Sequence, residues 1–172
     1  MSTQQFQGPV EMLDGLEMKG TKLRGAILPV VSITDATYTV RAEESGTIFT
    51  LNRSAGVVVT LPSATAGLVY EFHIGTTATG TLTVNSAGTD DTLQGVIFTH
   101  DKDNLGSVLA LNANVDTSGW NSPVAADHQL VLNADTDGRF IGGHVVYKCI
   151  TAAIWSVSGH LFGDGTATHP FT

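Results

Sequence analysis

The sequence is poor in the residues from which many functional sites are built. Cys149 is the only cysteine in 172 residues, which excludes a disulfide or a thiolate metal cluster within one chain. Its place in an apolar run predicts a small buried side chain. Only eight lysines and arginines stand against sixteen acidic residues, and the net charge is −8. Because clusters of basic side chains bind phosphate backbones, nucleic acid is not expected as a partner.

Long apolar runs and targeting signals are also missing. No stretch approaches the roughly 20 apolar residues that a membrane-spanning helix needs. The first residues, MSTQQFQ, lack the basic start and the apolar core of a signal peptide. We therefore expect a protein that is made in a cytoplasm and has no membrane partner.

Common enzyme motifs are absent. The chain has no G-x-S-x-G elbow, H-E-x-x-H zinc motif, P-loop or dinucleotide-binding glycine motif. No His-x-His pair places two imidazoles side by side on one strand. The histidines are His73, His100, His128, His144, His160 and His169. We expect them to be exposed or hydrogen-bonded on strands and loops, and a metal site across a symmetry axis stays open. No catalytic residue and no cofactor is predicted.

One segment partly matches a calcium-binding loop. Residues Asn133–Gly138 place oxygen-bearing side chains at alternate positions and a glycine at the sixth. The twelfth position is His144, where a calcium loop needs a bidentate glutamate. Because Asp and Gly favour tight turns, we interpret the segment as a turn and predict no metal.

Short strand patterns with clear turns begin in the stretch Arg41–Ile74. Apolar and polar residues alternate in Thr47–Leu51 and Leu68–Ile74, and a β-branched run occupies Val57–Leu61. The link Asn52–Gly56 contains residues that tolerate positive φ. We therefore expect the second strand to return antiparallel to the first.

Further strand patterns recur at the spacing of a β-sandwich or barrel. They lie at 38–41, 81–85, 93–99, 107–111, 129–132, 144–149 and 153–157. The longest loop is expected at 112–127, and the tail at 159–172 is expected to pack along the body or a neighbouring subunit. We predict an all-β fold, an antiparallel β-sandwich or barrel-like domain at 37–172 with an extended N-terminal arm at 1–36.

The arm is the segment in which we expect the binding residues. Gly15 and Gly20 disfavour a helix, and Pro29 restricts its neighbours to an edge strand or a linker. Either the arm folds back as an edge strand on its own sheet, or it lies on another subunit. We favour the second interpretation, because a free arm would expose many apolar side chains. The predicted subunit-binding residues are Leu13, Leu16, Met18, Lys19, Lys22, Leu23, Arg24, Ile27 and Leu28.

Glycine, asparagine, proline and aromatic positions between residues 45 and 72 form a further pattern. They are Ser45-Gly46, Phe49, Leu51-Asn52, Gly56, Val59-Thr60-Leu61-Pro62, Gly67, Tyr70 and Phe72. This succession resembles a β module of tailed-bacteriophage virion proteins, found in head decoration (cement) proteins and in some fibre proteins. The resemblance covers about a fifth of the chain and implies a place in the virion, after synthesis in the host cytoplasm. It identifies no binding site.

The resemblance implies a structural function. We expect a capsid decoration protein, a homotrimer on the outer head surface that links neighbouring major capsid protein subunits. The alternative is a tail-fibre or receptor-binding module for host surface glycans, with Trp120, Tyr38 and Trp155 as candidate aromatic contacts. A third interpretation, a polysaccharide-cleaving enzyme, lacks a recognisable acid/base pair.

Overall fold

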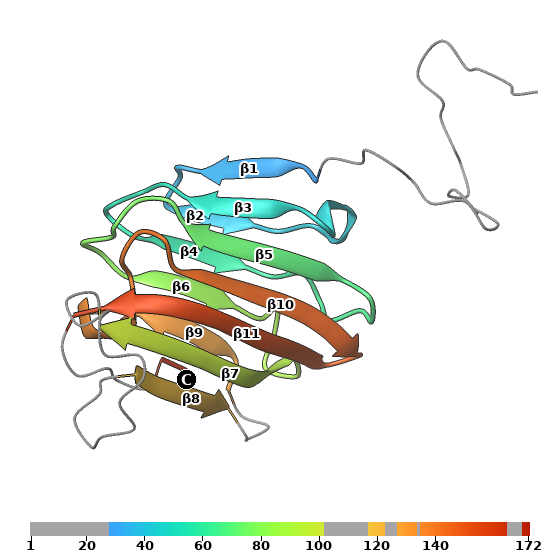
Figure 1. Cartoon of the computed structure of the whole chain (residues 1–172). Helices are drawn as coiled ribbons and strands as arrows, with labels where there is room; N and C mark the ends of the chain where they lie inside the picture. The colour runs from blue at the N-terminus through green and yellow to red at the C-terminus, as the bar shows by residue number, and fades with distance from the viewer. Residues whose placement is uncertain (1–27, 102–116, 123–126, 134, 165–169) are drawn as a thin grey trace, which may run out of the picture.

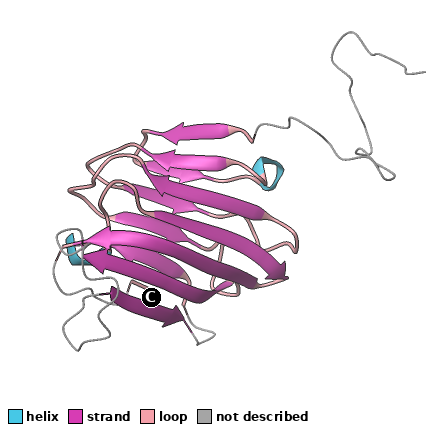
Figure 2. Cartoon of the chain, viewed as in Figure 1, coloured by secondary structure: helices cyan, strands magenta, loops and turns pink. Residues whose placement is uncertain are grey.

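The computed structural model describes residues 28–101, 117–122, 127–133, 135–164 and 170–172 (Figure 1). These residues form two β-sheets and two short 3-10 helices, Ala42–Glu44 (η1) and Asp135–Asp137 (η3) (Figure 2). The prediction of an all-β fold is confirmed. Within these ranges, no helix is long and apolar enough to cross a membrane.

The strands divide into a large and a small sheet. The large sheet has the order β1-β3-β5-β10-β11-β7-β8. Its strands are Val30–Ile33 (β1), Ile48–Leu51 (β3), Val69–Ile74 (β5), His144–Thr151 (β10), Ile154–Gly163 (β11), Thr92–Asp101 (β7) and Thr117–Ser122 (β8). The small sheet has the order β2-β4-β6-β9. Its strands are Thr37–Thr39 (β2), Val57–Thr60 (β4), Leu82–Asn85 (β6) and Gln129–Leu132 (β9).

The first six strands alternate between the two sheets. In the large sheet β1 pairs in parallel with β3, and β3 with β5, so that Val30 lies opposite Ile48, and Ile48 opposite Glu71. The small sheet repeats this rule in the pairs β2–β4 and β4–β6. The chain is thus wound into stacked coils, as in a β-solenoid. The predicted antiparallel pairing of 57–61 with 47–51 is wrong, because β3 and β4 lie in different sheets.

The link Asn52–Gly56 is a corner between the sheets. The carbonyl of Ser54 accepts hydrogen bonds from the backbone N–H groups of Thr79 (2.7 Å) and Gly80 (3.1 Å), in the corner of the next coil. Gly56 has φ +94°, and a Cβ there would overlap that neighbouring corner. The positive φ that Gly56 adopts therefore allows two coils to stack, and does not form the hairpin that the sequence predicts.

The second half of the chain adds mostly antiparallel pairs. Strand β10 is antiparallel to β5 and β11, and β8 is antiparallel to β7, while β11 and β7 are parallel. Among the described strands, five pairs are parallel and four are antiparallel, so the predicted antiparallel architecture is correct only in part. Strand β8 falls within the loop predicted at 112–127, which corrects that prediction. The strand predicted at 107–111 lies outside the described residues.

The inward faces of the two sheets form one hydrophobic core. The alternation of β5 buries Tyr70, Phe72 and Ile74, as its sequence pattern predicts. Phe49 and Trp155 extend this aromatic layer over the neighbouring strands. Cys149 is buried as expected, and burial raises the pKa of its thiol. This thiol is therefore a packing group.

Both ends of the described chain lie on the body. Strand β1 falls within the segment 1–36 that is predicted as an arm, and it pairs with β3 as an edge strand of the large sheet. This placement agrees with the edge-strand interpretation for the neighbourhood of Pro29. At the other end, Phe171 is buried and forms a bridge with Leu130, so this part of the tail packs along the body.

Candidate functional site

The structure places one of the nine predicted binding residues. Leu28 directly precedes Pro29 and β1, and 54% of its surface is exposed. The other eight, Leu13, Leu16, Met18, Lys19, Lys22, Leu23, Arg24 and Ile27, lie outside the described residues. The proposed arm contact is therefore represented in the structure by its last residue.

Leu28 belongs to an apolar edge of the large sheet. Val30, two residues further along, is 64% exposed. Strand β1 is the terminal strand of this sheet, and β3 is its one partner among the described strands. A terminal strand offers backbone hydrogen-bonding groups on its open side, to which another chain can add. Apolar side chains next to such an edge favour contact with another protein.

A second feature of the large sheet is a row of four histidines on its outer face. Register pairs His73 of β5 with His144 of β10, and His144 with His160 of β11. The ring centroids are 5.6 Å apart in the first pair and 5.8 Å in the second. His100 of β7 completes the row, with its ring 5.3 Å from that of His160. We call these four residues the imidazole row.

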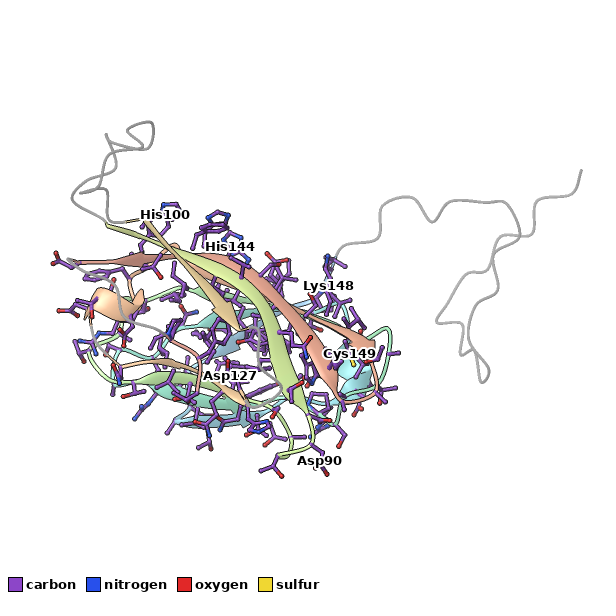
Figure 3. The ribbon with its side chains drawn as sticks, turned by 90° about the horizontal axis from the view of Figure 1, so that it is seen from below. Asp90, His100, Asp127, His144, Lys148 and Cys149 are labelled. Atoms are coloured by element: carbon purple, nitrogen blue, oxygen red, sulfur yellow. The ribbon has the colours of Figure 1, made fainter. Side chains whose placement is uncertain are left out.

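His100 and His160, at the end of the imidazole row on β7 and β11, make several close contacts. Nε2 of His100 and Nδ1 of His160 are 3.0 Å apart, a hydrogen-bonding distance. Phe98 stacks on His160 at 5.6 Å, and Phe162 lies 5.9 Å from His100. Figure 3 shows His100 and His144 on the same outer side of the sheet. These contacts hold the rings together across neighbouring strands.

In the ranges that the structure describes, few charged groups lie next to the row. Oε1 of Glu71 lies 2.7 Å from Nε2 of His73. Burial lowers the pKa of His144, as do the neighbouring His73 and His160, while Glu71 raises it by a smaller amount. Burial and then His160 lower the pKa of His100. The lowered pKa values of His100 and His144 favour their neutral imidazoles at neutral pH.

The sequence predicts exposed or hydrogen-bonded histidines on strands and loops, and the structure agrees with this prediction only in these general terms. They lie on strands and contact one another, but no spacing along the chain brings them together. The signal that could have found them is their position on the outward face of four separate alternating strands. Within the described part of the chain, no group of three or more His, Cys, Asp or Glu residues is arranged to hold a metal ion.

The predicted turn at Asn133–Gly138 uses its carboxylates internally. Asp137 is buried and accepts hydrogen bonds from the N–H of Asn133 (3.1 Å) and the hydroxyl of Thr136 (3.3 Å). Oδ1 of Asp135 accepts from Nε and Nη2 of Arg139, at 3.0 and 2.8 Å. These donors engage both carboxylate oxygens of Asp137 and Oδ1 of Asp135, for which a calcium ion would have to compete.

We therefore expect calcium to leave the stability of the protein unchanged. The melting temperature in millimolar CaCl2 should differ by less than about 1 °C from that in EDTA, because a ligand stabilises only the folded state that binds it. Differential scanning calorimetry measures the difference. A rise of several degrees would show that Asp135 and Asp137 exchange their protein partners for the ion.

The small sheet carries a polar pocket of about 230 Å³ at one of its ends. Hydroxyl, amide and imidazole groups line it, from Thr60, Asn85, Ser86, Gly88, Thr89, His128 and Gln129. None of these side chains is an acid or a permanently charged base. The pocket can therefore exchange hydrogen bonds with a neutral polar ligand.

Comparison with known proteins assigns no family to the chain. No family model, no curated protein and no solved structure matches the chain.

Proposed function

We propose that the protein is a structural virion component, a bacteriophage capsid decoration protein that binds the outer head surface. In this proposal its β-sandwich body sits on the shell, and its N-terminal arm links neighbouring major capsid protein subunits. The assembly is a homotrimer, as the resemblance of residues 45–72 implies. The proposal involves no catalysis, cofactor, nucleic acid or membrane.

The observation that carries the proposal is the exposed apolar edge formed by Leu28 and Val30. These side chains present large apolar surface to solvent beside a terminal strand. They directly follow the segment that contains the other eight predicted contact residues. An apolar segment that continues into an open sheet edge is suited to ordering on a second protein chain.

Stabilisation of a shell needs no chemistry in this arrangement. Each arm makes a modest contact, and several arms held by one oligomer act together. A ligand that binds the assembled shell, and not its separated subunits, raises the stability of the shell by mass action. Low basic content in the body fits a protein contact better than a nucleic-acid contact.

Binding to undecorated heads of the phage that encodes the chain tests the proposal. We expect deletion of residues 2–26 to abolish co-sedimentation with these heads, and Leu28→Asp to weaken it about tenfold by placing a charge in an apolar contact. The matched control is Ile141→Asp, since Ile141 is 61% exposed but lies in the turn before β10. Circular dichroism and melting temperature establish that each variant is folded. Undiminished binding by the folded deletion variant would contradict the proposal.

The polar pocket of the small sheet favours a second candidate, a receptor-binding module for host glycans. Its neutral hydroxyl and amide groups suit sugar hydroxyls. Of the three aromatic residues expected to contact sugar, Trp120 has its backbone in β8, opposite Ile97, whereas Trp155 is buried in the core. Glycan-array binding that disappears in Asn85→Ala would favour this candidate. Immunogold labelling of the particle separates the two, since a decoration protein covers the head and a receptor-binding module marks the tail.

A further inference from the structure

The imidazole row brings four histidine side chains from four strands into contact. The ordinary pKa of histidine is about 6.5, so mild acid adds protons to imidazoles whose rings lie only 5.3 to 5.8 Å apart. Each added proton places positive charge beside the next ring. We propose that the imidazole row is an acid-sensitive element that stabilises the large sheet when neutral and weakens it when protonated. This inference is independent of the proposed virion function.

The strands that the row crosses make the effect structural. His144 and His160 lie opposite each other in the antiparallel pair β10–β11, and like charges directly opposite each other destabilise such a pair. His100 and His160 bridge the parallel pair β7–β11 through ring nitrogens 3.0 Å apart. This contact needs one nitrogen to accept a hydrogen bond, and a doubly protonated pair has no acceptor. Protonation therefore opposes both pairings that hold β11 in the sheet.

The charged groups around the row do not cancel this repulsion. On β5, Glu71 contacts His73, with its Oε1 2.7 Å from Nε2 of the ring. On β10, Lys148 lies on the same face, beyond Val146, and adds positive charge. On the other sides the row meets neutral groups: Thr50 of β3 lies opposite His73, and Phe98 and Phe162 contact the end on β7 and β11. Among the side chains that the structure describes, one carboxylate thus accompanies four imidazoles.

The direction of the pH dependence follows from the two histidines with lowered pKa values. His100 and His144 bind protons less readily in the folded protein than in the unfolded chain, whose value is 6.5. The unfolded state therefore gains protons first as the pH falls. The stabilisation is complete above pH 6.5 and is lost as the pH drops through the folded-state values.

Thermal unfolding between pH 7.5 and 5.0 tests the proposal, with EDTA present so that metal binding to imidazole does not contribute. We expect the wild-type melting temperature to fall by at least about 3 °C over this range, which in a chain of this size corresponds to about a tenfold change in the unfolding equilibrium constant. A variant with glutamine at all four positions, H73Q/H100Q/H144Q/H160Q, should lose most of this slope. The matched control His128→Gln, which changes a histidine outside the row, should keep it.

A second measurement does not depend on the folding of the fourfold variant. Nuclear magnetic resonance titration of the wild-type imidazoles should give midpoints below 6.5 for His100 and His144, with curves broadened by coupling to their neighbours. Midpoints at or above 6.5 for both residues would overturn the proposal. So would a folded fourfold variant whose melting temperature follows the wild-type pH profile.

Discussion

Gly95→Ala should be among the most destabilising single substitutions in this protein, with an expected loss of about 4 kcal/mol or more in the free energy of unfolding. Gly95 lies in β7, opposite Val157 of β11 in a parallel pair. A Cβ at Gly95 would overlap the carbonyl oxygen of Val157 and lie 2.7 Å from its carbonyl carbon. Its φ of +156° adds strain for a residue with a side chain. Because the obstacle is backbone, no side-chain rotation relieves it.

Gly88→Ala is the matched control for this prediction. A Cβ at Gly88 meets no atom within 4 Å, so the substitution should change the free energy of unfolding by no more than about 0.5 kcal/mol. Urea denaturation at 25 °C measures both variants through the transition midpoint and slope. Equal midpoints for the two variants would mean that β7 and β11 do not pair closely at Gly95.

Strand positions and buried faces could be read from the sequence because they depend on local patterns. The alternation of 68–74 separates a buried face from an outer one without any knowledge of the neighbouring strands. Tyr70, Phe72 and Ile74 are buried as that pattern requires. The same pattern does not name the partner strand, since parallel and antiparallel neighbours leave the same period of two.

Because alternation does not identify the partner strand, the sequence could not predict how the first six strands wind between the two sheets. The link 52–56 has the glycine and asparagine that a hairpin needs, and a corner between two sheets needs the same freedom of φ. What decides between them is the stacking of this corner on the corner at 75–80, a contact between residues about 25 positions apart. Strand β8 was missed on similar grounds, because the sequence TSGWNS has no apolar alternation and pairs with β7 through its backbone.

The residues of the candidate site also divide into those that the sequence predicts locally and those that only the strand order brings together. Leu28 could be chosen from composition, since an apolar residue before Pro29 has no place in the interior of a sheet. The imidazole row could not be chosen, because its four members come from four strands separated by up to 87 positions along the chain. They meet only once β5, β10, β11 and β7 are placed side by side. The non-consecutive strand order therefore brings together the titratable side chains to which we assign a role.

Phe49→Ala should cost about 3 to 5 kcal/mol in the free energy of unfolding, the range for removing a fully buried phenylalanine ring. Phe49 is central to the aromatic layer of the core. Its ring stacks on Phe72 at 5.1 Å, and it contacts Tyr38 at 5.6 Å and Tyr70 at 6.3 Å. These partners lie on β2 and β5, which belong to different sheets, so the cavity would lie where the two sheets meet.

Phe98→Ala removes the same ring from the outer face and provides the control. Phe98 is 41% exposed and has its contact with His160 at 5.6 Å, so its loss should cost about 1 kcal/mol or less. Phe49→Leu, which keeps much of the core volume, should cost about 1.5 kcal/mol. Chemical denaturation of the three variants gives the order. If Phe49→Ala and Phe98→Ala were equally destabilising, the aromatic layer at Phe49 would not be the contact that joins the two sheets.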